Sequence, residues 1–210
     1  MAASADVHRI FLRRLPLTLV GSMMVWLLLR PAIDTATAGL AQVFIRSFEQ
    51  PRVTRLVVRD HRAEVRRADF RSDSSIPTVA LTEIHFNTIV LLALYFALPR
   101  PFSRRQLERL FMGWCVLYLT QSLNLVFHVK FLFASGLGEW SRQTYSDFAR
   151  NFFGFLQYFT DLPGRFSFPF LIWLSFNWDL VMELLAPGVA RDRATAETPR
   201  ATKKVKTGKH

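Results

Sequence analysis

Long apolar stretches are the feature that most constrains the fold of this chain. A helix needs about 20 mostly apolar residues to cross a bilayer, because the hydrocarbon core is about 30 Å thick and each residue rises 1.5 Å. Four stretches come near this requirement, and they are 15–34, 84–98, 107–134 and 166–186. Half of the 210 residues are hydrophobic, 20 are Phe, and the net charge is +11. This combination favours an integral membrane protein over a soluble domain.

The four stretches predict a mainly α membrane protein with four transmembrane helices. The first, 15–34, is interpreted as an anchor, and the alternative is a signal peptide cleaved near 36–38. The third is long enough to cross with a tilt. The fourth follows a break at Pro163–Gly164. We therefore expect one membrane domain over 15–186.

Charge sets the expected orientation, because basic loops stay in the cytoplasm. The short connection 100–109 carries four arginines. With four spans both termini lie on the same side as this connection. We therefore expect a multi-pass protein of the bacterial inner membrane with both termini cytoplasmic. Residues 1–14 form the N-terminal segment, and 187–210 read as a disordered basic tail.

The segment 52–84 predicts a small extracytoplasmic antiparallel β sheet. Apolar and polar residues alternate on both sides of the polar turn Asp60–His61, which is typical of a hairpin. The segment 78–84 is a plausible third strand. About 30 residues cannot bury a core of their own, so we expect this sheet to rest on neighbouring helices or a partner.

Two further helices are expected outside the membrane. The first span is expected to bend at Pro31 and to continue as an amphipathic helix until Pro51. An amphipathic outer helix is predicted at 147–160, where four phenylalanines recur at helical spacing. Its polar residues favour an interfacial or re-entrant position over a crossing.

Polar groups inside a membrane are costly, and the third span carries three of them on one face. Gln121, Asn124 and His128 stand at i, i+3 and i+7, and Tyr118 extends the same stripe. Such a face could relay protons or bind a ligand, with His128 titrating near neutral pH. The alternative, which we prefer, is that these groups join the helices by hydrogen bonds.

Two carboxylates, Asp179 and Glu183, share one face of the fourth span. Paired carboxylates can share a proton and act as acid and base. They lie near the cytoplasmic end, where Arg104, Arg105 or Arg109 could reach them. We favour ion pairs because charges in membranes usually pair.

The evidence for a metal or cofactor site is slight. Glu83 and His85 could supply two ligands, but a third is not evident, and His61 does not supply it from sequence alone. The single cysteine, Cys115, excludes an internal disulfide, and its apolar surroundings predict an inert thiol. Phosphate-loop and hydrolase motifs do not occur. We expect no metal and no cofactor.

The predicted hairpin carries four arginines that could bind a partner, and they are Arg55, Arg59, Arg62 and Arg66. Charge alone would also attract nucleic acid, but an outward membrane loop is not expected to meet it. An acidic protein surface, anionic lipid or glycan is the more sensible partner. Binding of anionic vesicles by the hairpin would fall with salt if lipid were the target.

The order of spans, small β segment and outer helix resembles that of the small bacterial membrane proteins associated with exosortases, of the exosortase H-associated type. The similarity covers most of residues 10–186 and includes the motif Ile84-His85-Phe86-Asn87-Thr88. It implies an accessory to a membrane sorting enzyme that resembles a transpeptidase, and it assigns no catalytic residues. Exosortases use a membrane-embedded Cys with Arg and His. Cys115 has no suitably placed Arg on its span, so we do not expect the enzyme itself.

These observations predict a non-catalytic accessory or assembly protein that contacts the lipid bilayer and another integral membrane protein, with no role for nucleic acid. The competing hypothesis is a small transporter or intramembrane enzyme. It would use Gln121, Asn124 and His128 with Asp179 and Glu183.

Overall fold

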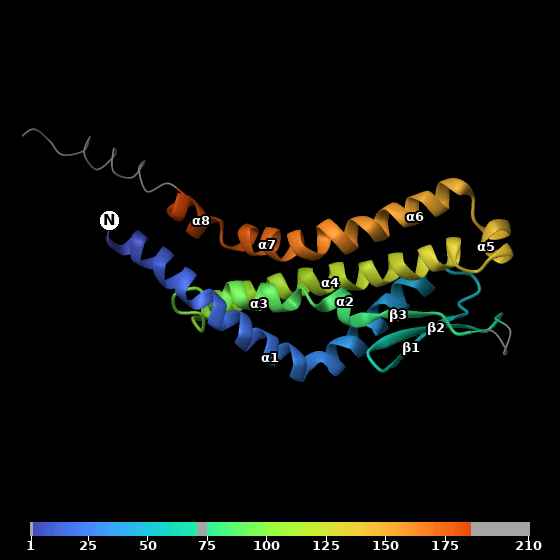
Figure 1. The fold of residues 1–210 in the computed structure, drawn as a ribbon, viewed down its shortest axis with the longest axis horizontal. Helices are drawn as coiled ribbons and strands as arrows, with labels where there is room; N and C mark the ends of the chain where they lie inside the picture. The colour runs from blue at the N-terminus through green and yellow to red at the C-terminus, as the bar shows by residue number, and fades with distance from the viewer. Residues whose placement is uncertain (1, 71–74, 186–210) are drawn as a thin grey trace, which may run out of the picture.

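The computed structural model describes residues 2–70 and 75–185, so the predicted tail at 187–210 lies outside the described residues. These residues are mostly helical, at 74%. The helices are α1 (Ala2–Ser47), α2 (Leu81–His85), α3 (Thr88–Phe96), α4 (Arg104–Ser135), α5 (Glu139–Thr144), α6 (Asp147–Phe159), α7 (Arg165–Phe176) and α8 (Trp178–Leu185). Figure 1 shows α1 and α4 running along most of the length of the molecule.

Two helices of the described residues, α1 and α4, are long and apolar enough to cross a membrane. The predicted second span is divided into α2 and α3 by a turn at Phe86–Asn87, and α3 has nine residues. Nine residues rise about 14 Å, which is less than half of the hydrocarbon core. The predicted fourth span is likewise divided, into α7 and α8, at Asn177. Four transmembrane helices therefore remain a prediction.

α1 is one continuous helix that contains Pro16 and Pro31. Figure 1 shows that it changes direction along its length, which agrees with the bend expected at Pro31. Its C-terminal part then passes beside the sheet. Ala38, Ala41 and Ile45 of this part are buried against the strands, so the helix that follows the first predicted span supports the sheet.

The predicted hairpin is confirmed. β1 (Thr54–Arg59) pairs with β2 (Arg62–Arg67) in antiparallel register, with Leu56 opposite Val65 and Arg59 opposite Arg62. Asp60 and His61 both have positive φ, at 46° and 60°. This is the backbone that a tight two-residue hairpin turn requires, and Asp tolerates it better than most residues.

The third strand is shorter than predicted. β3 covers only Thr78–Ala80, antiparallel to β2, and the chain becomes helical at Leu81. Leu81 and Ile84 are buried in the core beneath the sheet. A helical turn brings both of these side chains to one face, whereas a strand would point them to opposite faces. The expectation of a strand through Ile84 was therefore wrong.

The break expected at Pro163–Gly164 was also wrong. A π-helical turn, Thr160–Gly164, joins α6 directly to α7, and Pro163 lies inside it. Proline has no amide hydrogen to donate to the helix, and a wider π-helical turn tolerates this missing hydrogen bond without ending the helix. Figure 1 shows α6 and α7 following one another alongside α4. The helix predicted at 147–160 is thus the first half of a longer helical run.

Two large cores and a small cluster of Trp26, Ile33 and Ile89 hold the described residues together. One lies between the sheet, the end of α1, α2 and the second half of α4. The other joins α3, the first half of α4, α7 and α8. Figure 1 shows the start of α1, the α3–α4 turn and α8 at one end of the molecule, and the sheet and α5 at the other. The sheet therefore rests on helices, as expected.

Candidate functional site

A buried carboxylate joins three elements where α1, α2 and the hairpin meet. Asp34 of α1 lies 2.6 Å from Nε2 of His85 through one oxygen and 2.6 Å from Nδ1 of His61 through the other. The side chain of Asp34 is 1% exposed and that of His85 is 0% exposed, whereas His61 is 41% exposed. The sequence places these residues far apart, and the structure brings them together.

The hydrogen bond from Trp26 determines which ring nitrogen of His85 carries the proton. The indole Nε1–H of Trp26 donates to Nδ1 of His85 over 3.0 Å. An indole nitrogen can only donate, so Nδ1 carries no proton, and Nε2 must be the atom that donates to Asp34. His85 is therefore neutral and fully bonded. Arg30 lies over the Trp26 ring at 5.4 Å and donates to the Thr82 hydroxyl.

This arrangement is a junction more than a reaction centre. Both ring nitrogens of His85 are engaged, each oxygen of Asp34 faces a histidine, and the two side chains are at most 1% exposed. Glu83 is 66% exposed and faces Arg165 at 3.6 Å, so the Glu83–His85 pair is not brought together. Within residues 2–70 and 75–185, no group of three possible ligands has metal-binding geometry.

The polar face of α4 bonds to neighbouring elements at each of its three positions. Gln121 Nε2 donates to Asn87 Oδ1 at 2.7 Å and to Thr88 Oγ1 at 2.8 Å. Asn124 Oδ1 accepts from the Thr160 hydroxyl at 3.0 Å. These contacts tie α4 to the start of α3 and to the π-helical turn, as interhelical hydrogen bonding predicts.

His128 lies at the end of the same face and has a more charged environment. Its Nδ1 lies 3.1 Å from Gln157 Nε2, and its Nε2 lies 3.1 Å from a carboxylate oxygen of Asp161. Arg165 pairs with Asp161 at 2.9 Å and so shares this carboxylate. The three predicted residues therefore contact different partners and do not converge on one empty site.

Asp179 pairs with arginines, as the ion-pair interpretation predicts. Its Oδ2 lies 3.3 Å from both Arg105 and Arg109. Asp179 is 76% exposed, so the pair with Arg105, which is also exposed, contributes little to stability. The side chain of Glu183 lies outside the described residues. Asp179 and Glu183 with the polar face of α4 stay the residues of the competing catalytic hypothesis.

The four arginines of the hairpin occupy one face of the sheet. Arg55 and Arg59 alternate with buried residues on β1, and the cross-strand pairs are Arg55 with Arg66 and Arg59 with Arg62. Within the described part of the chain, Glu64 is the only carboxylate that pairs with them, at 2.6 Å from Arg66 and 3.8 Å from Arg59. Four arginines against one carboxylate leave this face with a net positive charge. Like charges directly opposite each other destabilise a sheet.

The next arginine, Arg67, points to the other side and is enclosed. Its guanidinium lies 5.0 to 5.7 Å from the rings of Phe133, Trp140 and Phe70. It pairs with Glu49 at 2.9 Å and Asp69 at 2.8 Å, and the side chain is 12% exposed. The hydrogen bond with Asp69 raises the pKa of Arg67 and lowers that of Asp69. This cation connects the sheet to α4, α5 and the segment after α1.

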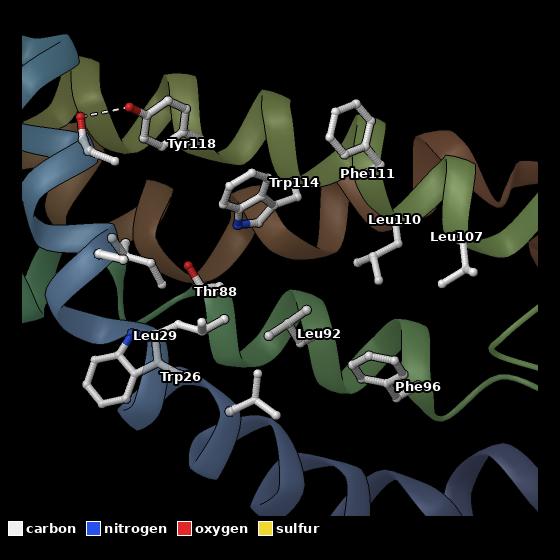
Figure 2. A pocket seen from close by; sticks show the side chains of 14 residues that line it. Trp26, Leu29, Thr88, Leu92, Phe96, Leu107, Leu110, Phe111, Trp114 and Tyr118 are labelled. Atoms are coloured by element: carbon white, nitrogen blue, oxygen red, sulfur yellow. Dashed lines mark hydrogen bonds between the residues drawn. The ribbon is translucent and has the colours of Figure 1, made fainter.

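An apolar groove lies between α1, α3 and α4, with a volume of about 470 Å³. Figure 2 shows side chains from the three helices facing this space, among them Leu29, Leu92 and Phe111. Three polar groups at its wall have partners, since Thr88 accepts from Gln121, Tyr118 donates to the Ala36 carbonyl and Trp26 donates to His85. Cys115 of α4 is exposed and is not part of this lining.

The sequence indicated some of these features and missed others. The Asp34 junction could not be found, because the sequence suggests no reason to combine a residue of α1 with a turn histidine. For the enclosure of Arg67 by three aromatic rings, the sequence offered one indication, which is Asp69 two positions later. Asp69 pairs with Arg67 in the structure. Nothing in the sequence indicated the groove, since its lining residues have the pattern of ordinary apolar helix surface.

The long apolar helices, the buried polar contacts between them and the small sheet at one end define a helical membrane protein. The sequence pattern of one known family, the exosortase H-associated membrane proteins, matches residues 5–180. The chain belongs to this family, as the resemblance predicted. No curated protein and no solved structure matches it.

Proposed function

We propose that this chain is a non-catalytic accessory or assembly subunit of an envelope protein-sorting system of the exosortase kind. Membership of an exosortase-associated family is consistent with such a role. The single observation that carries the proposal further is the arginine face of the sheet, Arg55, Arg59, Arg62 and Arg66. The partner is another integral membrane protein with an acidic surface outside the membrane.

The energetics of the arginine face favour a partner. Two pairs of arginines stand directly opposite each other, and Glu64 offsets only part of their charge. This arrangement costs stability in the isolated protein, and carboxylates supplied from outside would remove the cost. Complementary charge also speeds association and sets the orientation of docking.

The placement of the elements supports the expected topology. The start of α1, the basic α3–α4 turn and α8 lie at one end, opposite the sheet and α5. Lys and Arg in short loops mark the cytoplasmic side. In our proposal the first end is cytoplasmic, the protein crosses the inner membrane more than once, and the sheet faces outward.

The contacts of the polar residues support a non-catalytic role. Gln121, Asn124 and His128 each contact different partner residues, which are Asn87 and Thr88, Thr160, and Gln157 and Asp161. A transporter or intramembrane enzyme would need such groups to converge on a shared cavity. The bonds described above account for these residues as connections between helices.

The experiment is capture of the partner by charge-reversed protein in the native host. Arg55, Arg59, Arg62 and Arg66 are changed together to Glu, and bound membrane proteins are quantified after mild detergent extraction. We expect loss of the partner. A control reverses three exposed arginines outside the strands, Arg46 near the end of α1, Arg52 before β1 and Arg142 in α5, and it is expected to keep the partner.

Folding is checked separately, because Arg66 also pairs with Glu64. Both variants are compared with the unmodified protein for membrane level and thermal midpoint. A second variant with the four arginines changed to Gln removes the charge without reversing it, and its remaining capture should depend less on salt concentration than capture by the unmodified protein does. Undiminished capture by the folded charge-reversed protein would overturn the sheet as the docking surface.

A further inference from the structure

No contact described above fills the groove between α1, α3 and α4. Its lining is almost wholly apolar and comes from Val25–Ala36 of α1, Thr88–Phe96 of α3 and Leu107–Tyr118 of α4. The groove is open at its rim, where Leu29 is 51% exposed and Phe111 is 61% exposed. Its volume of about 470 Å³ falls in the range of sites that bind small-molecule ligands.

The position of the groove between two candidate membrane-spanning helices determines whether it faces water or lipid. α1 and α4, which form two of its walls, are the helices long and apolar enough to cross a membrane. The groove therefore opens toward the hydrocarbon of the bilayer. With Thr88 and Tyr118 already bonded inside the protein, the wall offers an occupant mainly contact with aromatic and aliphatic carbon.

One end of the groove carries charge. On α4 the lining residues Leu107, Phe111, Trp114 and Tyr118 repeat at helical spacing, and the same stripe continues one turn back to Arg104. Arg104 is 94% exposed and pairs with Glu108, which is 63% exposed. Such an exposed pair is weak and a phosphate can replace it. Arg100 is also exposed and lies in the same turn.

An apolar channel at bilayer depth with arginines at one mouth is complementary to a lipid. We propose that this groove binds one acyl chain of an anionic phospholipid, with the headgroup phosphate at Arg100 and Arg104. A partner helix is the alternative occupant, because Ala32 and Ala36 stand four residues apart, the spacing of small residues at which membrane helices approach closely. The larger side chains of the other lining residues and the arginines at the mouth favour the lipid.

The test uses the full chain in lipid bilayers of phosphatidylcholine with a minor fraction of phosphatidylglycerol. A photoreactive group on an acyl chain of the phosphatidylglycerol marks the contact positions, which are mapped by mass spectrometry. We expect labelling at Leu29, Leu92 and Phe111 to exceed labelling at Leu28, which is 80% exposed and does not line the groove.

Ala32→Phe fills the groove from an exposed position and should abolish this excess, whereas Leu28→Phe is the matched control and should retain it. Leu92→Trp replaces Ala32→Phe if the latter fails to fold, as judged by thermal midpoint. Arg100→Gln with Arg104→Gln should reduce the preference for phosphatidylglycerol over a phosphatidylcholine probe about fivefold.

Equal labelling of groove and control positions, or labelling that survives Ala32→Phe, would overturn the site. Equal labelling by the two headgroups in the unmodified protein would overturn the assignment to anionic lipid. Cross-linking of a protein segment in the groove would replace the lipid with a partner helix. None of these results depends on the sheet, so this inference stands or falls separately from the proposed docking function.

Discussion

Asp34 and His85, 51 positions apart, are joined by a 2.6 Å contact between Oδ1 and Nε2, with both side chains almost completely buried. The other oxygen of Asp34 holds His61 in the turn of the hairpin. One carboxylate therefore connects α1, α2 and the sheet. Because the proposed docking face lies on that sheet, this junction sets its position relative to the helices.

Replacement of Asp34 should destabilise the whole fold. Asp34→Leu leaves the Nε2–H of His85 buried without an acceptor and releases His61 from α1. We expect a loss of about 1–3 kcal/mol in the free energy of unfolding, which is the usual cost of leaving a buried polar group without its partner. Thermal denaturation in detergent measures the loss.

Glu139→Leu is the control for this variant, because Glu139 is an exposed carboxylate at the far end of the molecule. Its thermal midpoint should stay close to that of the unmodified protein. Equal stability of the Asp34→Leu and Glu139→Leu variants would show that the junction does not hold the sheet in place.

Gln121 should matter for stability through its two acceptors. Gln121→Leu removes the donor that Asn87 and Thr88 share, and both of these side chains are buried. We expect a loss of about 1–3 kcal/mol, the cost of leaving buried polar groups unpaired. Thermal denaturation again provides the measurement, and Thr120→Val, which removes only a hydroxyl bonded within its own helix, should cost less.

The polar residues of α4 and α8 should not be needed for partner capture. His128→Ala and Asp179→Asn remove the best candidates for acid–base chemistry and leave the arginine face intact. We expect both variants, at normal expression, to retain the partner and to leave the cellular phenotype unchanged. A loss of phenotype with normal folding would favour the competing transporter or enzyme hypothesis.

The pair of Arg67 and Asp69 should make stability depend on acid pH. The hydrogen bond from Arg67 lowers the pKa of Asp69 below its usual value of 3.8. The ionised carboxylate therefore stabilises the folded protein above about pH 3.8, and this contribution is lost as the pH falls through the lowered pKa. Asp69 is 47% exposed, so solvent limits the effect to less than about 1 kcal/mol.

Asp69→Asn tests this dependence. At neutral pH the unmodified protein should have the higher thermal midpoint, and the difference should shrink as the pH is lowered toward about 3. A difference that stays constant across this range would mean that the charge of Asp69 does not contribute.

Patterns confined to a short segment predicted the structure well. The alternation around Asp60–His61 gave the hairpin and its turn, and the spacing of Gln121, Asn124 and His128 gave their shared helix face. Both follow from the fixed periodicities of strands and helices. The family was likewise evident from the order of the elements.

Features that depend on tertiary packing were not predictable in the same way. Pro163 reads as a helix break, but α6 and α7 stay continuous because a π-helical turn absorbs it beside α4. Leu81 and Ile84 fit a strand by pattern, yet burial of both against one core selects a helix. Asp34 meets His61 and His85 because α1 continues past Pro31 and packs against the sheet.

Affinity purification from the native host at native expression, in mild detergent, followed by mass spectrometry, tests the central claim most directly. An accessory subunit should retain a second integral membrane protein in stoichiometric amount, and that protein should carry an acidic surface outside the membrane. Recovery of the folded chain alone, as a single homogeneous species, would contradict the docking role and shift attention to the polar face of α4.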